Sequence, residues 1–573
     1  MFEHFIFLFY LLIFTSSVIG YGFIFSKAIS NNFLSLNLGY QGLLGFFFLT
    51  LVSIITSFFF PHNFTHNILI HIVGLSSFLF FINKLKKIDQ IKSLIVIFFI
   101  LILGVYVFKN HDDFPYYHLT YALNLSENGY SVGLGNFSHG FRTISSLFYI
   151  HSIFYMPLIE FYLFHLGPFL ILLFFNFVIL FLLFNNFENK KINFLYFFSL
   201  LSLIFVDIVF YRLSEHGTDR SSQILLLLIF ILFFEILLYE ESFKKVSNKL
   251  YLLTIIIFLA ASIKVIYYLY LILIPILLFK KKIFKKFILS KNYILIGFTF
   301  LFLSLNLLMS YFNTGCLVYP APKTCFESKE WSISKDEVKG LSIHYEWWAK
   351  AGGGPNYKAD MDPKEYVKNF NWLANWIDRH FFNKVSDTLL GIILISIILF
   401  YSIKYSSQKK IVNNKYNLNI NKKSLLLIYF IPIIFFIEWF LNHPAMRYGG
   451  FVLFALPIFI YSARKMDQFN IDKKKIYKIT TFFVILTFVV FNSRNLIRIN
   501  KEIDFYGYNV FKSPFFYVDQ NVETVLLDNF EGYKVYSIKN GSYCWAAKTP
   551  CSNSKSVRIK DFLWMKMFYK KSE

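Results

Sequence analysis

The stretch LGPFLILLFFNFVILFLLFNN at residues 166–186 decides the fold class, because it contains no charged side chain. About 20 apolar residues in an α-helix span the ~30 Å hydrocarbon core of a bilayer. Comparable runs recur along the 573 residues, of which 56% are hydrophobic and only 16% are charged. The sequence therefore predicts an all-α polytopic membrane protein. It excludes a soluble enzyme, a nucleic-acid-binding module and a membrane β-barrel, whose strands alternate apolar and polar residues.

The apolar runs predict about 12–14 transmembrane helices. Candidate spans lie near residues 5–25, 40–60, 67–83, 92–108, 166–186, 192–211, 221–239, 249–279, 287–310, 388–403, 424–441, 448–463 and 477–492. The 249–279 run is too long for one span, so we expect a hairpin broken around Ser262–Lys264. The first run lacks a small-residue cleavage site and is expected to be a retained helix. The 143–164 stretch carries His151 and Glu160, and we expect an interfacial or re-entrant helix there.

The basic residues predict the orientation. The chain has a net charge of +23, and short cytoplasmic loops of membrane proteins are enriched in Lys and Arg. Basic clusters lie at residues 84–92, 190–191, 244–249, 280–286, 404–423 and 464–478. The remaining loops, at 109–142, 212–220, 311–387 and 442–447, then lie outside. We expect a transmembrane domain over 1–492 and a small periplasmic domain over 493–573.

The four cysteines form two close pairs, both in regions that are predicted to lie outside. An oxidising compartment favours two local disulfides, Cys316–Cys325 and Cys544–Cys551. Four unpaired thiols are the alternative. A zinc site is disfavoured because neither pair has Cys-x-x-Cys spacing.

The first long outside loop begins NHDDFPYYH at residues 110–118. Two adjacent carboxylates, Asp112 and Asp113, directly follow a predicted span, where desolvating a charge is costly. One of them is a candidate for the site, and the other for capping the next helix. The alternative is a solvated loop in which the Asp pair only caps that helix.

Basic residues at the ends of other spans complete a candidate site. Lys264 interrupts the apolar run AASIKVIY at residues 260–267, and Arg447 lies in the outside loop NHPAMRYGG at residues 442–450. An intramembrane Lys predicts an anionic partner, and Arg is the better bidentate phosphate ligand. The alternatives are a Lys that snorkels to the interface and an ordinary turn with an interfacial Arg. The short outside loop RLSEHGTDR at residues 212–220 adds further ionisable groups near the same face.

Loop 311–387 contains five tryptophans, including Trp331. They can stack on sugar rings or rest on the membrane as an aromatic belt. The chain contains neither a Walker A loop nor a dinucleotide-binding glycine motif, so an ATP-driven pump and a cytoplasmic nucleotide-sugar site are disfavoured. An activated donor on the outside would then be carried by a lipid.

This arrangement resembles the GT-C superfamily of integral membrane glycosyltransferases. The resemblance lies in the Asp112–Asp113 motif on the first large outside loop, the amphipathic helix after it, the charged second loop and the C-terminal portion. More narrowly, Tyr117-His118, GLGN at 133–136, Phe141-Arg142, TGCLVYP at 314–320 and Arg447-Tyr448-Gly449 are similar to motifs of membrane proteins encoded with bacterial surface-polysaccharide genes.

The resemblance implies an inverting glycosyltransferase in the bacterial inner membrane, with its active site on the periplasmic face. It implies a polyprenyl-phosphate-linked sugar donor, a glycan or lipid acceptor, and Asp112 or Asp113 as the general base. Some members use a divalent cation, so Mg or Mn at Asp112, Asp113 and Asp219 is one expectation. The expected substrate-binding residues are Tyr117, His118, Asn136, Arg142, Glu215, Asp219, Arg220, Lys264, His443, Arg447 and Tyr448.

Other functions remain open at this point. A transporter or flippase for lipid-linked glycans would need basic residues along a mid-membrane lumen, and apart from Lys264 the span centres hold few ionisable residues. A polymerase or ligase of the O-antigen type would rely on Arg and His in large outside loops. A non-enzymatic assembly protein is the third alternative.

Overall fold

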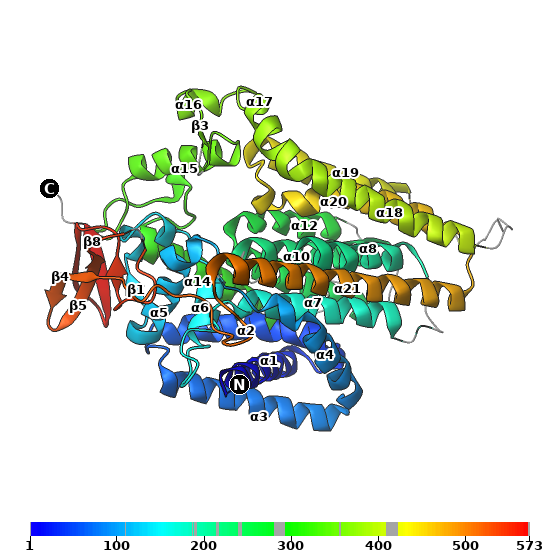
Figure 1. Cartoon of the computed structure of the whole chain (residues 1–573), viewed down its shortest axis with the longest axis horizontal. Helices are drawn as coiled ribbons and strands as arrows, with labels where there is room; N and C mark the ends of the chain where they lie inside the picture. The colour runs from blue at the N-terminus through cyan, green and yellow to red at the C-terminus, as the bar shows by residue number, and fades with distance from the viewer. Residues whose placement is uncertain are drawn as a thin grey trace.

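A computed structural model of the chain describes residues 2–108, 110–185, 187, 192–213, 217–238, 243–279, 293–354, 357–407, 422–541 and 543–570. Long helices lie side by side as a bundle, and the C-terminal strands gather at one end of it (Figure 1). The long helices are α1 (Phe2–Ile29), α2 (Leu38–Ser57), α3 (Phe64–Leu85), α7 (Leu166–Phe184), α10 (Thr218–Leu238), α11 (Phe243–Ile263), α14 (Tyr293–Thr314), α18 (Ser386–Ser406), α19 (Lys422–Asn442) and α21 (Lys473–Tyr506).

Shorter helices connect and cover this bundle. They are α4 (Ile88–Leu101), α5 (Leu119–Asn128), α6 (Ser146–Ser152), α8 (Phe194–Val209), α12 (Leu273–Leu278), α15 (Lys335–Ala349), α16 (Pro363–Tyr366), α17 (Leu373–Trp376) and α20 (Gly450–Met466). Helices of the 3₁₀ or π type are η1 (Phe33–Ser35), η2 (Ile102–Gly104), η3 (Phe114–His118), η4 (Leu134–Asn136), η5 (Gly140–Arg142), η7 (Val265–Ile272), η8 (Pro322–Thr324), η9 (Ile377–Val385) and η10 (Met446–Tyr448).

Ten helices within the described residues are long and apolar enough to cross a membrane. A multi-pass α-helical membrane protein is therefore confirmed. The prediction of 12–14 spans included four further stretches, which the structure folds as shorter helices: α4, α8, η7 with α12, and α20. A helix rises about 1.5 Å per residue, so these helices are shorter than a ~30 Å hydrocarbon core.

Helix α10 forms the centre of the bundle, with 94% of its apolar span buried, whereas α3 and α14 bury only 17%. A helix that is apolar on all sides is stable only when neighbours surround it, in protein or in lipid. The long helix α11 ends at Ile263, Lys264 adopts an extended backbone, and η7 packs back against α11. The expected break around Ser262–Lys264 is thus confirmed.

The 143–164 stretch forms only the short helix α6, followed by turns from residue 153 to 165. Helix α6 is buried and packs against α2 and α5. The stretch, which lies within the described residues, therefore forms no regular helix long enough to cross a membrane, and its interfacial or re-entrant placement stays a prediction.

The C-terminal strands form two three-stranded sheets. One holds β4 (Thr524–Phe530), β5 (Tyr533–Ile538) and β6 (Cys551–Ser552), and the other has the order β1 (Ser131–Val132), β8 (Met565–Lys570), β7 (Val557–Phe562). A small hairpin pairs β2 (Gly353–Gly354) with β3 (Tyr357–Lys358). Strand β1 pairs in parallel with β8, so the C-terminal part shares a sheet with the 109–142 loop. The expected boundary at residue 493 falls inside α21, which continues without a break to Tyr506.

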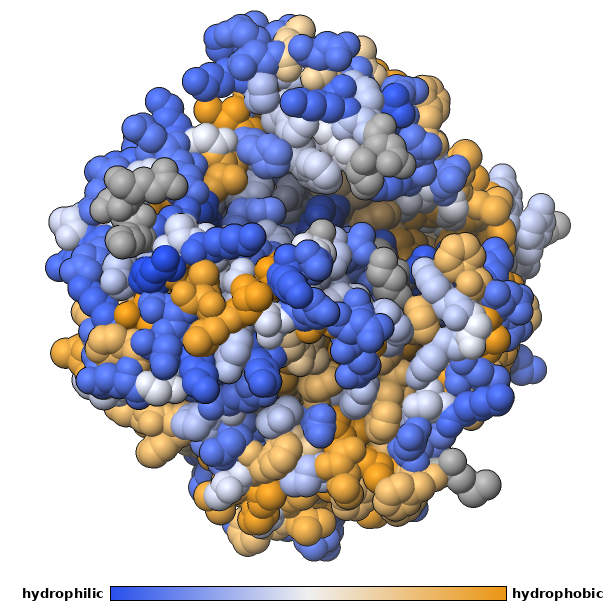
Figure 2. Space-filling view, turned by 60° about the vertical axis from the view of Figure 1, so that its left-hand side comes forward, coloured by the Kyte–Doolittle hydropathy of each residue, from blue (hydrophilic) through white to orange (hydrophobic). Residues whose placement is uncertain are grey.

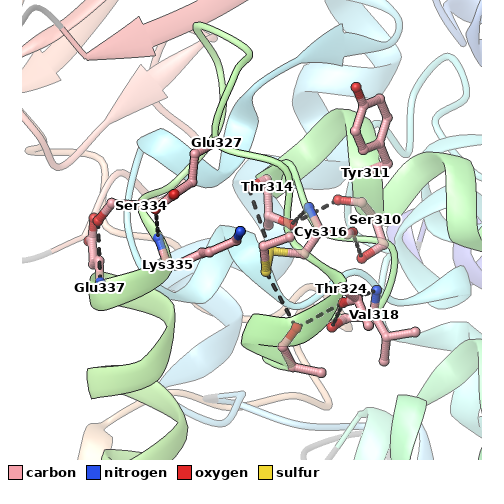
Figure 3. Close-up of a disulfide and its surroundings, with 12 residues drawn as sticks. Ser310, Tyr311, Thr314, Cys316, Val318, Thr324, Glu327, Ser334, Lys335 and Glu337 are labelled. Atoms are coloured by element: carbon pink, nitrogen blue, oxygen red, sulfur yellow. Dashed lines mark hydrogen bonds between the residues drawn. A yellow bond between two sulfur atoms is a disulfide. The ribbon is translucent and has the colours of Figure 1, made fainter.

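Both predicted disulfides are present, Cys316–Cys325 and Cys544–Cys551. Figure 3 shows the first of them with the hydrogen bonds around it. The Thr324 hydroxyl accepts a hydrogen bond from the backbone nitrogen of Val318 at 3.1 Å. The disulfide and these hydrogen bonds close a compact turn directly after α14.

Candidate functional site

Four charged side chains from distant parts of the sequence meet in one cluster, which we call the charge cluster: Asp113, Asp219, Lys264 and Arg447. The Lys264 ammonium pairs with Asp219. The Arg447 Nε lies 2.9 Å from the second oxygen of Asp219, and its Nη2 lies 3.3 Å from the Asp113 carboxylate. Arg447 therefore bridges two carboxylates that lie more than a hundred residues apart in the chain.

Each member of the charge cluster sits where a helix begins or ends. Asp219 is the second residue of α10, and an acidic residue in the first turn is favoured by the helix dipole. Lys264 follows the end of α11, and Arg447 lies in η10 between α19 and α20. Gly449, at φ +104°, makes the turn into α20. These ends converge because α10, α11, α19 and α20 pack beside one another.

Two anions and two cations make the charge cluster electrically balanced. Burial by itself would raise the pKa of Asp113, but the His111 imidazole and the Arg447 guanidinium hold that pKa well below its usual range. The His111 ring lies 3.4 Å from the Asp113 carboxylate, and this contact raises the pKa of His111. Asp113 is therefore a carboxylate at neutral pH, and its basicity depends on its cationic partners.

Aromatic side chains line the charge cluster. The Lys264 Nζ lies 4.5 Å from the centre of the Tyr448 ring, close enough for a cation–π contact. Tyr117 packs edge-on against His118, with ring centres 4.4 Å apart. The Nε2 atom of His118 has no hydrogen-bond partner among the described residues, and burial lowers the pKa of this imidazole to about 4. His118 is therefore a neutral ring next to the carboxylates.

The charge cluster is partly open to the surface. The side chains of Asp113 and Arg447 keep 29% and 36% of their surface exposed, whereas those of Asp219 and Lys264 keep 12%. Figure 2 shows that the end of the molecule with the strands is hollowed below the lobe at its top, with hydrophilic residues around the mouth. The accessible pair is thus Asp113 and Arg447, and the buried pair lies behind it.

The expected divalent cation at Asp112, Asp113 and Asp219 does not fit this geometry. Within the part of the chain that the structure describes, no three His, Cys, Asp or Glu residues are placed to hold a metal ion. Arg447 joins Asp113 to Asp219, where a bridging cation would lie, and Asp112 has an exposed side chain. The carboxylates therefore already have cationic partners within the protein.

Two of the predicted substrate-binding residues hold segments of the protein together. The Asn136 Nδ2 donates to the backbone oxygens of Gly133, Trp331 and Phe568, at 3.1, 3.0 and 3.3 Å. Arg142 donates to the backbone of Gly135 and pairs with Glu337 on α15 at 2.6 Å. Both side chains are buried, and both join the 109–142 loop to later parts of the chain.

The remaining predicted residues divide between the protein interior and the cluster. Arg220 stacks on Phe210 and Phe451, with its Cζ 4.9 and 4.6 Å from the two ring centres. The His443 Nε2 lies 3.0 Å from Glu438 on α19. Glu215 lies outside the described residues. Sequence reasoning did not select His111, although its position directly before the Asp pair was the available signal.

These features define a multi-pass helical membrane protein with a balanced charge cluster where several of its helices end. A family model described as "Domain of unknown function (DUF8201)" matches residues 4–454. The match covers more than half of the chain, so the chain belongs to this family. No curated protein and no solved structure matches the chain. The matched region contains all four members of the charge cluster and ends within α20.

Proposed function

We propose that this protein is a membrane glycosyltransferase that moves a sugar from a polyprenyl-phosphate donor to a glycan or lipid acceptor. In this proposal it acts with inversion at the outer face of the bacterial inner membrane. The observation that carries the proposal is the contact of Arg447 with both Asp113 and Asp219 in a partly exposed site. A base and an anion-binding group thereby lie in direct contact.

The cations provide a place for the donor phosphate. A guanidinium binds phosphate oxygens through two parallel hydrogen bonds, and the Arg447 side chain is exposed enough to turn towards a ligand. Lys264, paired with Asp219 behind it, supplies a second positive charge. As the sugar–phosphate bond breaks, negative charge grows on the departing phosphate, so both cations stabilise the transition state more than the ground state.

Binding of the donor phosphate to Arg447 would also activate the base. When the phosphate draws Arg447 away, the Asp113 carboxylate loses a cation that keeps its pKa low, and its basicity increases. Asp113 then accepts the proton of the acceptor hydroxyl as that oxygen forms a bond with the anomeric carbon. The bond from this carbon to the phosphate oxygen breaks on the opposite face, and the phosphate leaves with the bonding electrons.

The disulfides support the outer face as the site of transfer. Such bonds persist in oxidising compartments and are rare in the cytosol. Cys316–Cys325 follows α14, and Cys544–Cys551 lies beside β5 in the C-terminal sheets. Trp545, next to the second disulfide, donates its backbone N–H to Pro115, close to Asp113. The charge cluster thus lies at the same end of the molecule as this disulfide, which supports the proposed face.

The test uses the purified full-length protein in liposomes with a panel of polyprenyl-phosphate hexoses as donors and a mixture of bacterial surface glycans and lipids as acceptors. Released polyprenyl phosphate is measured by mass spectrometry. Asp113→Asn should lower the release rate at least ~100-fold, the usual contribution of general base catalysis. Asp112→Asn, which changes the neighbouring exposed carboxylate, is the matched control and should retain most of the activity.

Full release by Asp113→Asn would refute the base assignment. Passage of donor across the bilayer with no released phosphate would identify a flippase instead. Release of a polyprenyl diphosphate from an oligosaccharide-linked donor would identify a polymerase or ligase.

A further inference from the structure

A pocket of about 540 Å³ lies between the end of α14 and strand β7, and we call it the strand pocket. Ligand pockets commonly enclose roughly 300–1,000 Å³. The walls that matter for the argument are Tyr311, Trp331 and Phe562 on the apolar side, and Lys329, Glu330 and Lys560 on the charged side. None of the residues that line this pocket belongs to the charge cluster.

The apolar wall is a group of aromatic rings in edge-to-face contact. Trp331 meets Phe562 at a centroid distance of 5.1 Å and Tyr311 at 5.8 Å. A pyranose ring has an apolar face of C–H groups that packs against such aromatic surfaces. Its hydroxyls, at the edge of the ring, both donate and accept hydrogen bonds.

The rim of the strand pocket carries charges of both signs. Lys560 pairs with Glu330, and the two side chains keep 37% and 59% of their surface exposed. Lys329 is also exposed at the rim. Sugar hydroxyls can donate to Glu330 and accept from the lysines, whereas a purely apolar ligand can do neither.

The walls are held in place before any ligand binds. The Trp331 Nε1 donates to the Tyr311 backbone oxygen at 3.1 Å, and the Trp331 backbone oxygen accepts from Asn136. Asn136 also reaches Phe568 on β8, the strand paired with β7. A preformed pocket loses little conformational entropy on binding.

We propose that the strand pocket binds an oligosaccharide, as a glycan site separate from the charge cluster. The idea that this oligosaccharide is the acceptor of the transfer rests on the proposed function. The idea that the strand pocket binds a saccharide does not. The acceptor chain would be held by a rigid aromatic wall while its reacting hydroxyl enters the site of transfer.

The test measures binding without turnover. Full-length protein in nanodiscs, with Asp113→Asn in every sample, is applied to an array of bacterial surface oligosaccharides. The best-bound glycan is then titrated by Trp fluorescence. Phe562→Ala should weaken its binding at least ~10-fold and Lys329→Ala about 3-fold, since the first removes a ring of the apolar wall and the second a hydrogen-bond donor. Leu563→Ala and Lys339→Ala, at exposed positions outside the pocket, should bind as the parent does.

Absence of binding to every glycan on the array would overturn the proposal, as would binding that neither pocket variant weakens. Phe562→Ala samples are used only when their size-exclusion profile matches that of the parent, which shows that they fold. Lys329 is exposed, so the glycan affinity of Lys329→Ala tests the pocket independently of folding. Because every sample carries Asp113→Asn, loss of glycosyl transfer cannot produce or hide the binding result.

Discussion

The replacement Asp219→Asn tests whether the charge cluster holds the ends of the helices together. The Asp219 side chain is only 12% exposed, accepts a hydrogen bond from Lys264 and forms an ion pair with Arg447. The variant keeps the shape of the side chain and removes its charge. Arg447 retains Asp113, whereas Lys264 loses the carboxylate with which it pairs and keeps its contact with the Tyr448 ring.

The expected loss of stability follows from the unpaired lysine. Removing one partner of a buried ion pair costs about 3–5 kcal/mol, because the remaining charge stays buried without compensation. The small residual exposure of Lys264 and its cation–π contact reduce this cost. We expect Asp219→Asn to lower the free energy of unfolding by about 2–4 kcal/mol.

A double-mutant cycle with Lys264→Met separates this effect from general disruption. Methionine has a similar length and no charge, so the double variant lacks the unpaired ammonium. Unfolding is followed in mixed micelles by titration with a denaturing detergent, for the parent, both single variants and the double variant. The coupling energy between the two positions should be about 2 kcal/mol, as is usual for residues in direct contact.

A loss below ~0.5 kcal/mol for Asp219→Asn, the size of an ordinary surface substitution, would show that the pair contributes little to stability. Additive single-variant effects would show that Lys264 and Asp219 do not interact in the folded protein. Either result would refute the geometry on which the proposed site depends.

Three further predictions concern the pH dependence that His111 and Asp113 confer and the structural side chain of Asn136. The pKa of His111 is raised in the folded protein, so protonated His111 stabilises the fold below its ordinary pKa of 6.5, and this stabilisation is lost as the pH rises through the raised value. The melting temperature should therefore fall above pH 6.5. This fall should be weaker in His111→Asn. The pKa of Asp113 is lowered in the folded protein, so its carboxylate stabilises the fold above its ordinary pKa of 3.8, and this stabilisation is lost as the pH falls well below that value. When the melting temperature is measured against pH, Asp113→Asn should lack this loss of stability in acid. Asn136→Ala should destabilise the protein by about 2–4 kcal/mol, because the buried backbone oxygens of Trp331 and Phe568 lose the side-chain amide that donates to them. The exposed control Asn521→Ala should change stability by less than ~0.5 kcal/mol in the same titration.

Much of the fold could be predicted because it depends on local composition. An apolar run such as 166–186 must form a helix in a bilayer, since its backbone polar groups have no other partners there. The break at Lys264 follows from placing a charge in such a run. The cysteine pairs are close in sequence, so their loops are short and few partners compete for each thiol.

The candidate site could be predicted only as a set of residues. The sequence points to Asp113 and Lys264 because a charge at the end of an apolar helix is costly without a partner. It points to Arg447 because a guanidinium suits phosphate, and to Asp219 because it lies in a short charged loop near the same face. Their pairing could not be predicted, because it depends on how α10, α11, α19 and α20 pack. The partners of Asn136 and Arg142 could not be predicted either. Both are residue types that commonly bind ligands, but in the structure Asn136 donates to backbone oxygens and Arg142 pairs with Glu337.

The sequence alone thus determined that the chain is a helical membrane protein, where most of its helices lie and which cysteines pair. The helices follow from the cost of placing polar groups in hydrocarbon, and the cysteine pairs follow from their closeness in the sequence, so both properties are local. Only the tertiary structure decided that Arg447 joins two distant carboxylates and that β1 pairs with β8. Contacts between segments hundreds of residues apart are selected by packing of the whole chain, and no local pattern contains that information.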